Sequence, residues 1–278
     1  MISPNEISVI LSTYNAPAWL EKSLWGYACQ TIRPREVMVA DDGSDSRTAA
    51  VLSSIRKRTG LVVKHVWHED DGFRKCTILN RSIERAEGEY LIFSDGDCIP
   101  RHDFVAVHQQ FAERGYYLSG GYNKLPMQVS RQITLDDISA GDAFAPLWLR
   151  KNGLRVGRTM LRLYSRGRWA SMLNATTTTR PTWNGHNASG WKTDLYRVNG
   201  FDERMRYGAE DCEMGDRLVN VGVKPKQIRF NAICVHLDHA RGYVNAEDWK
   251  YNQQIRRSTR TTGCVKTMHG INAVSKAA

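Results

Sequence analysis

The chain lacks the features that carry a protein into or across a membrane. Its 278 residues contain no apolar run close to the roughly 18 residues that a membrane-spanning helix needs. Residues 1–6 lack the basic start and the apolar core of a signal peptide. We therefore expect a cytoplasmic protein, with a peripheral position on the inner face of the cytoplasmic membrane as an alternative.

Several common functional motifs are also missing. The six cysteines are widely spaced and form no Cys-x-x-Cys pair, so we expect reduced, mostly buried thiols rather than disulfides or a zinc site. No Gly-x-Gly-x-x-Gly and no Gly-Lys-Ser/Thr follows the first predicted strand. These absences argue against a dinucleotide-binding fold and against a P-loop.

Acidic residues are missing from the middle of the chain. None occurs between Asp142 and Asp194, although the whole chain has 39 Lys and Arg against 29 Asp and Glu, a net charge of +10. The cations of this stretch are Arg150, Lys151, Arg155, Arg158, Arg162, Arg166, Arg168, Arg180 and Lys192. Apolar residues interleave with them, which suits an amphipathic helix on an anionic membrane or a groove for an acidic acceptor. A merely solvated face, or an insertion packed on the domain, is the alternative.

Strand-like and helix-like segments alternate through the first hundred residues. Short apolar runs at 6–12, 36–40, 61–67 and 90–93 predict strands. Between them, helices are predicted from Pro17 through Tyr27, over 46–59, and over 75–87 with Gly88 as the cap. This order predicts an α/β fold with a mainly parallel central sheet flanked by helices.

Polar residues follow three of the predicted strands. Thr13-Tyr14-Asn15 follows the first, Asp41-Asp42 ends the second and Asp95-Gly96-Asp97 ends the fourth. The carboxyl ends of parallel strands share one edge, where ligands bind, so these groups should converge. Two carboxylates this close need a compensating cation, and hard oxygen ligands suit Mg²⁺ or Mn²⁺. A solvated Asp-Gly turn is the alternative reading of Asp95-Gly96-Asp97 alone.

These motifs together resemble the nucleotide-binding half of glycosyltransferase family 2, which has a GT-A fold with a Rossmann-like donor half and an acceptor half. The resemblance implies that Asp97 contacts the metal directly and that Asp95 reaches the metal through water or reaches the ribose. It implies that Asp41 or Asp42 accepts hydrogen bonds from uracil or ribose. The base pocket and the rest of the donor site would be lined by Thr13, Tyr14, Asn15 and Trp191.

The segment 69–83 resembles that of chondroitin-polymerase and β-1,4-galactosyltransferase-like enzymes, with one departure. These relatives often carry arginine before the asparagine that corresponds to Asn80, whereas this chain has Leu79. A phosphate or uridine contact would then pass to Arg74, Lys75 or Arg81. Further along the chain, we predict a helix from 104 to 118, and residues 119–122 resemble the short strand that follows the metal motif in GT-A proteins.

The segment 183–218 resembles the C-terminal part of the same enzymes. In the resemblance, Asp211 is the general base and Glu210 helps to hold the acceptor, although acids at a helix start could also be plain capping residues. A histidine after the last strand, predicted over 228–235, often supplies a third metal ligand. By position His236 suits this role, with His239 contacting phosphate or packing structurally.

The resemblance implies an inverting, metal-dependent transfer of a hexose from a UDP-sugar to a saccharide or lipid-linked glycan acceptor, in bacterial surface polysaccharide synthesis (lipopolysaccharide core, O-antigen or capsule). We expect one domain over 1–278, with a donor half at 6–122, a basic insertion at 123–182, an acceptor half at 183–240 and a basic tail at 241–278. A sugar nucleotidyltransferase and a non-enzymatic nucleic-acid-binding protein are the alternatives. Nucleic acid is not expected as a partner, because a basic binding module would not explain carboxylates gathered at strand ends.

Overall fold

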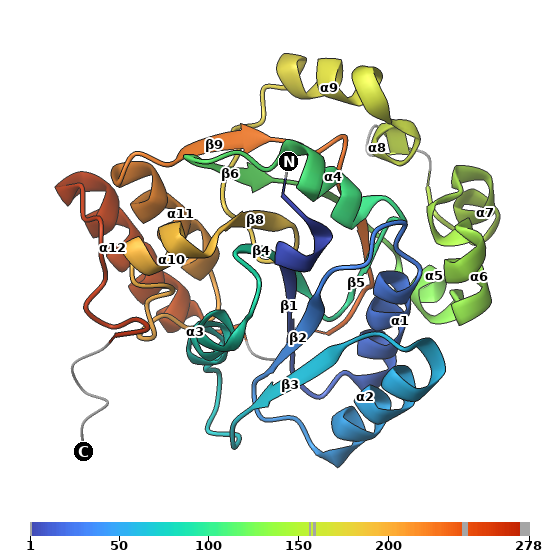
Figure 1. Ribbon diagram of the computed structural model, residues 1–278, viewed down its shortest axis with the longest axis horizontal. Helices are drawn as coiled ribbons and strands as arrows, with labels where there is room; N and C mark the ends of the chain where they lie inside the picture. The colour runs from blue at the N-terminus through green and yellow to red at the C-terminus, as the bar shows by residue number, and fades with distance from the viewer. Residues whose placement is uncertain (1, 156, 158–159, 241–243, 273–278) are drawn as a thin grey trace.

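The central element is a seven-stranded sheet with the strand order β3-β2-β1-β4-β8-β6-β9 (Figure 1). The computed structural model describes residues 2–155, 157, 160–240 and 244–272. The first four strands in sequence are β1 (Ile7–Thr13), β2 (Glu36–Asp41), β3 (Val63–Trp67) and β4 (Tyr90–Asp95), and they are parallel. Strand β8 (Ala188–Trp191) runs antiparallel between β4 and β6 (Tyr116–Ser119), and β9 (Lys224–Gln227) pairs parallel with β6. The sheet is therefore mainly parallel, as predicted.

Helices cover both faces of this sheet. Helices α1 (Pro17–Ala28) and α2 (Ser46–Thr59) share one apolar core with the strands. Helices α3 (Lys75–Arg85), α10 (Lys192–Arg197) and α11 (Glu210–Asn220) share the core of the other face. Figure 1 shows the sheet lying between these two groups. The predicted helix over 75–87 ends two residues early and Gly88 is not its cap; instead Gly88 allows the chain to pass Ser8, whose amide would lie 2.6 Å from a Cβ.

A second sheet of three short strands joins the two halves of the sequence. Strand β10 (Ile233–His236) lies between β5 (Cys98–Pro100) and β7 (Gly121–Lys124). In this sheet His236 is paired with Cys98, the residue after Asp97. The small sheet thereby brings the end of the last strand beside the Asp95-Gly96-Asp97 turn.

Three predicted boundaries in this region are wrong. The helix expected from 104 to 118 is α4 (Phe104–Phe111), after which Gly115 has a φ of 78° and Tyr116 opens β6. The strand expected over 119–122 belongs partly to β6 and partly to β7, with Gly120 between them. The strand expected over 228–235 begins only at Ile233 and ends at His236.

The basic middle of the chain folds into short helices that share an apolar core with the three-stranded sheet. They are α5 (Met127–Gln132), α6 (Leu135–Ala140), α7 (Pro146–Lys151), α8 (Leu161–Tyr164) and α9 (Gly167–Thr176). The structure also describes two short 3-10 helices, η1 (Pro4–Glu6) and η2 (Asp142–Phe144). Helices α5 and α6 lie on α1, where Lys22 donates to the Ser130 carbonyl at 2.8 Å and Trp25 Nε1 donates to Ser139 Oγ at 2.8 Å. Figure 1 shows α7, α8 and α9 at the outer rim of the molecule. Arg158 lies outside the described residues.

The last described element, α12 (Ala246–Thr262), packs beside α11 (Figure 1). Arg256 Nε donates to Asp216 at 2.7 Å, and Thr259 donates to the buried Glu213 at 2.7 Å. Within the described part of the chain, no helix combines the length and the apolar character needed to cross a bilayer. The six cysteines are free thiols, and three of them are buried.

Candidate active site

The polar groups predicted to converge at the strand ends do lie at one edge of the sheet. Thr13 pairs with Asp41, and Ser12 pairs with Asp95 on the other neighbouring strand. Ser12 Oγ donates to Asp95 Oδ1 at 2.7 Å, and the Asp42 amide donates to the Thr13 carbonyl at 3.0 Å. The parallel arrangement of β2, β1 and β4 is thus what assembles this edge.

Asp41 and Asp42 are buried and are hydrogen-bonded within the protein. Asp41 accepts from the Ser44 amide at 2.8 Å and lies 2.8 Å from His65 Nε2. Asp42 lies 2.7 Å from His68 Nε2 and accepts from the Arg74 amide at 2.9 Å. Burial raises the pKa of Asp42, although His68 and Arg74 oppose this effect. Both carboxylates therefore also hold the loops that follow β2 and β3.

The residues after β1 are more open to a ligand. The Thr13 hydroxyl is buried and has no hydrogen-bond partner among the described residues. Tyr14 is 49% exposed and its hydroxyl donates to Asp70 at 2.8 Å. Asn15 adopts a φ of 45°, and its side chain accepts from the Asp45 amide at 3.0 Å. The Thr13 hydroxyl and the exposed ring of Tyr14 can therefore line a pocket, whereas Asn15 shapes the turn.

Asp97 lies between two histidines. Its Oδ2 is 3.0 Å from His239 Nε2 and its Oδ1 is 3.6 Å from His236 Nε2, and the two imidazoles stack with centroids 5.6 Å apart. Asp97, Cys98 and His236 offer ligand atoms within 4.8 Å of one another. Burial raises the pKa of the Cys98 thiol well above its usual range, so this thiol stays protonated and is a poor ligand.

The chemistry of this group fits a divalent metal ion. One carboxylate and one or two imidazoles are a donor set that Mn²⁺ accepts. His236 Nδ1 is buried without a hydrogen-bond partner in the described part of the chain, as expected if this imidazole serves to bind a metal ion rather than to stabilise the fold. Asp95 is turned toward Ser12 and Lys75 instead, so Asp97 is the carboxylate of the pair that faces the histidines.

Lys75 lies among three carboxylates from two distant segments. Its Nζ is 3.2 Å from Asp95 Oδ1 and 3.9 Å from Glu210 Oε1. Burial alone would lower the pKa of Lys75, but Asp95, Asp211 and Glu210 hold it well above its usual value. Burial alone would likewise raise the pKa of Asp95, but Lys75 and neighbouring histidines hold it well below its usual range. Asp95 is therefore ionised and paired with Lys75 at neutral pH.

The pKa of Asp211 is shifted in the opposite direction to that of Asp95. Burial raises its pKa to about 7, with Lys75 lowering the pKa and Glu210 and Asp95 raising it. Asp211 Oδ1 is buried with no partner among the described residues, while Oδ2 lies close to the Gly185 backbone. Glu210 Oε2 accepts from the Gly208 amide at 2.8 Å. A carboxyl group that titrates near pH 7 with one oxygen uncommitted is suited to general-base chemistry.

One histidine of the site was not singled out from the sequence. His186 lies near Asp95, Asp97 and His236, and its ring meets Tyr122 edge to face with centroids 4.3 Å apart. Burial lowers the pKa of His186 to about 4, so the ring is neutral at pH 7. The resemblance marked the segment 183–218, but no sequence signal distinguished its histidine from a core residue.

Trp191 is not near this edge, which corrects its expected place in the donor site. It pairs with Tyr90, the first residue of β4, whereas Asp95 is the last. Its indole is 4% exposed, donates to the Glu113 carbonyl at 2.9 Å and packs against the Tyr90 ring. Trp191 is therefore a packing residue at the opposite end of the strand.

Arg74 and Lys75 point in different directions. Arg74 donates to the Glu69 carbonyl at 2.6 Å and so remains with its own loop, whereas Lys75 enters the site. Arg81, the third option for the phosphate contact, has no hydrogen bond or ion pair in the described structure that would place it here.

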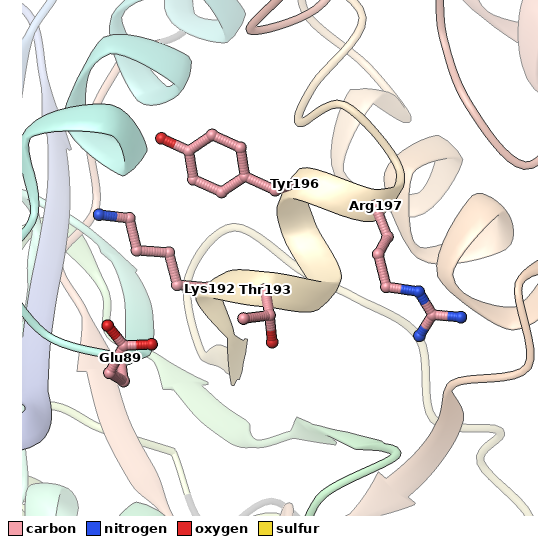
Figure 2. A pocket seen from close by; sticks show the side chains of 5 residues that line it. All are labelled: Glu89, Lys192, Thr193, Tyr196 and Arg197. Carbon is pink, nitrogen blue, oxygen red and sulfur yellow. The ribbon is translucent and has the colours of Figure 1, made fainter.

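A shallow hollow of about 600 Å³ also lies away from the carboxylates. Figure 2 shows its lining, Glu89, Lys192, Thr193, Tyr196 and Arg197. Glu89 precedes β4, and Lys192 donates to the Ala86 carbonyl at 2.6 Å, so both lie at the starting end of this strand. The hollow lacks the metal-ligating and titrating groups of the strand-end edge, and we place the site at that edge.

Comparison with known proteins agrees with this architecture. Residues 8–173, more than half of the chain, match the model of the family described as glycosyl transferase family 2. Validoxylamine A glucosyltransferase of Streptomyces hygroscopicus subsp. limoneus is 28% identical over 253 residues, which cover 84% of this chain and 52% of that protein. Chondroitin synthase of Escherichia coli is 26% identical over 246 residues, which cover 78% of this chain and 32% of that protein. The chain thus spans about half the length of the first relative and a third of the second.

Solved structures with the GT-A fold are also similar. The Pyrobaculum calidifontis mannosyltransferase PcManGT, in complex with GDP-Man and Mn²⁺, has a TM-score of 0.57 at 21% identity, covering 93% of this chain and 62% of that one. Staphylococcus aureus TarS 1-349, in complex with UDP-GlcNAc, has a TM-score of 0.59 at 18% identity, covering 90% of this chain and 65% of that one. At these identities the likeness establishes the fold.

Proposed function

Since the chain belongs to glycosyltransferase family 2, we propose that it transfers a hexose from a UDP-sugar to a saccharide or lipid-linked glycan acceptor with inversion of the anomeric configuration. The observation that carries this proposal is Asp211, which combines a pKa of about 7, an Oδ1 with no partner among the described residues and a position across Lys75 from Asp95. A base beside the donor site is what a single displacement requires.

In the proposed reaction Asp211 Oδ1 removes the proton from the acceptor hydroxyl. The hydroxyl oxygen forms a bond to the anomeric carbon from the face opposite the nucleotide, and the bond from that carbon to the diphosphate oxygen breaks. Glu210 holds the acceptor, and Lys75 lies where its ammonium offsets negative charge on the donor. Asp97 and His236, with His239 beside them, would hold Mn²⁺ or Mg²⁺, which when bound stabilises the charge that grows on the diphosphate.

The choice of a uridine nucleotide follows from the resemblance and from the relatives. TarS is described in complexes with UDP and with UDP-GlcNAc, whereas the mannosyltransferase is described with GDP-Man. In our proposal Thr13 and Tyr14 line the base pocket, and Asp41 or Asp42 contacts uracil or ribose. Both carboxylates are already hydrogen-bonded, so such a contact would add to the existing bonds at Asp42 or replace one of them.

We assign the donor half to 6–122 and the acceptor half to 183–240, with the basic insertion at 123–182 and the basic tail at 241–278 outside them. The proposed pathway is bacterial surface polysaccharide synthesis, with the protein cytoplasmic and peripheral on the inner membrane face. Lys124, at the start of the insertion, pairs with Asp238 at 3.1 Å. The insertion supports a membrane-facing role because, among the described residues, no ion pair joins its cations from Arg150 to Arg180 to an acid. Apolar side chains are exposed beside them, with Leu147 at 79%, Tyr164 at 60% and Trp169 at 51%.

Sedimentation with anionic and neutral vesicles tests the membrane proposal. Reversing the charge of Arg155 and Arg168 together should reduce binding to phosphatidylglycerol vesicles at least tenfold, because a cation near such a surface contributes about 1 kcal/mol. Reversing Lys57 and Arg58 on α2 is the matched control. Equal binding of both double variants would exclude this face as the membrane contact.

The reaction itself is tested with a panel of UDP- and GDP-hexoses, with and without Mn²⁺, in the presence of methyl glycosides as acceptors. We expect nucleotide release from one donor, loss of this release in Asp97→Ala, and loss of transfer with retained nucleotide binding in Asp211→Asn. Absence of binding and turnover with every nucleotide sugar would refute the proposed function. Formation of a sugar nucleotide with release of pyrophosphate would show a nucleotidyltransferase instead.

A further inference from the structure

The loop that precedes Glu210 and Asp211 is held by α12. Asn252 is fully buried, and its Nδ2 donates to the carbonyls of Arg206 and Gly208, both at 2.9 Å. The Gly208 amide in turn donates to Glu210 Oε2 at 2.8 Å. Asp248 adds an ion pair to Arg206 at 3.6 Å. One short loop therefore links the start of α12 to the carboxylate pair.

Trp249 of α12 packs against the same loop. It precedes Asn252 by three residues, so both side chains project from the same side of α12. A Cβ on Gly208 would lie 2.8 Å from the Trp249 Cδ1 atom, and Gly208 has a φ of 112°, so glycine is required on both counts. Three residues of chain span at most about 11 Å, which places Asp211 within one or two sugar units of this contact.

The indole of Trp249 is nevertheless 53% exposed. A tryptophan used only to anchor a helix would bury most of its surface, because that burial is the source of its stabilisation. Its neighbours on the loop are aromatic as well: Tyr207 meets Phe73 edge to face, with centroids 6.2 Å apart. Phe73 lies two residues before Lys75, so this aromatic pair joins the loop to the segment that carries Lys75.

A pyranose ring presents a flat face of C–H groups, which binds an aromatic face through dispersion and apolar burial. We propose that Trp249 is the platform on which a pyranose unit of the acceptor stacks while its hydroxyl is directed to Asp211. The acceptor subsite is then completed by the C-terminal helix rather than by 183–240 alone. This inference rests on the proposed function in one respect, that the acceptor is a saccharide.

Steady-state transfer to the methyl β-glycosides of glucose, galactose and their N-acetylamino forms tests the platform. Trp249→Ala should raise the acceptor KM about fivefold to tenfold with a smaller change in kcat, and Trp249→Phe should fall between this variant and the wild type. Tyr251→Ala is the matched control, because Tyr251 is 46% exposed on the same helix and projects from the opposite side. Affinity for UDP in the presence of Mn²⁺ and the melting temperature are measured for all variants.

The outcomes distinguish a failure of the platform proposal from a failure of the proposed function. A raised acceptor KM in Trp249→Ala alone, with unchanged UDP affinity and melting temperature, supports the platform. An acceptor KM within twofold of the wild type, or a parallel loss of UDP affinity and stability in Trp249→Phe, overturns it. The platform is also overturned if the wild type hydrolyses a donor but transfers the sugar to none of the glycosides, and if adding a glycoside causes no change in tryptophan fluorescence that is lost in Trp249→Phe. A wild type that binds no nucleotide sugar refutes the proposed function instead.

Discussion

Replacing Asp211 with asparagine should stabilise the folded protein at neutral and alkaline pH while it abolishes transfer. Burial raises the pKa of Asp211 to about 7, so the folded site prefers an uncharged group there. Asparagine has nearly the same shape and carries no charge at any pH. The variant therefore mimics the protonated carboxyl that the fold favours and lacks the base that the reaction needs.

The size of the effect follows from the difference between the folded and unfolded pKa. The unfolded value is near 3.9, so the gap is about three units, and each unit is worth about 1.4 kcal/mol. Asp211 keeps part of its surface exposed although Oδ1 is buried, and we therefore take about half of this sum, about 2 kcal/mol. In a protein of this size such a gain raises the melting temperature by about 4–8 °C.

The sign depends on pH in a defined window. Because the folded protein holds the extra proton, wild-type stability falls as the pH rises from about 4 to about 7 and is level above that. The advantage of Asp211→Asn should thus be small at pH 4 and full at pH 8. Thermal unfolding followed by circular dichroism at pH 4, 6, 8 and 9 measures it.

Asp202→Asn is the matched control, with the opposite sign. Burial alone would raise the pKa of Asp202, but hydrogen bonds from Arg204 and Thr267 hold it below its usual value. Its contribution is present above about pH 4 and is lost as the pH falls through the folded pKa, so Asp202→Asn should be less stable than the wild type at pH 8. A gain in Asp211→Asn that is the same at pH 4 and pH 8, or a loss at pH 8, would refute the reasoning for Asp211.

Three further predictions concern the same edge. Lys75→Met should destabilise the protein by about 3 kcal/mol in urea unfolding, because it leaves the Asp95 charge uncompensated. It should also move the pH profile of transfer to higher pH, because Lys75 lowers the pKa of Asp211; an unchanged profile would contradict the role of Lys75. His236→Ala and Asp97→Ala should each abolish Mn²⁺-dependent UDP binding in calorimetry, whereas retained binding in either would remove it from the metal site. Asn252→Leu should cost about 1–3 kcal/mol and lower kcat more than UDP affinity, because two loop carbonyls lose their donor; an equal loss of both would indicate general unfolding.

Much of the fold could be predicted from the sequence because the first half follows regular patterns. Short apolar runs alternate with amphipathic segments, and each pattern predicted the right type of element through β4. The pattern fails where local propensity and tertiary pairing disagree. Phe104–Phe111 continues in sequence into residues that look helical, but Tyr116 and Tyr117 are needed as an inner strand beside β8 and β9. Such a pairing depends on segments seventy and a hundred residues away, which no local window contains.

The candidate site likewise contains residues that the sequence predicted and residues that it did not. Groups placed by strand order, Asp95, Asp97 and the Asp41-Asp42 pair, were found because parallel strands bring their carboxyl ends together. His186 and the stacking of His239 on His236 depend on how separate loops meet in space, and the sequence carries no periodic signal for that. Trp191 illustrates the converse error: the resemblance implied a place in the donor site, yet its strand runs antiparallel to β4 and carries it to the other end of that strand.

The position of Lys75 explains how so many carboxylates tolerate one another. Asp95, Glu210 and Asp211 come from different halves of the chain, and without a cation their mutual repulsion would raise every pKa. Lys75 contacts Asp95 most closely and so keeps that carboxylate ionised, while Asp211 remains the group that titrates near pH 7. Two carboxyl groups with pKa values moved apart in this way can hold different roles in one site.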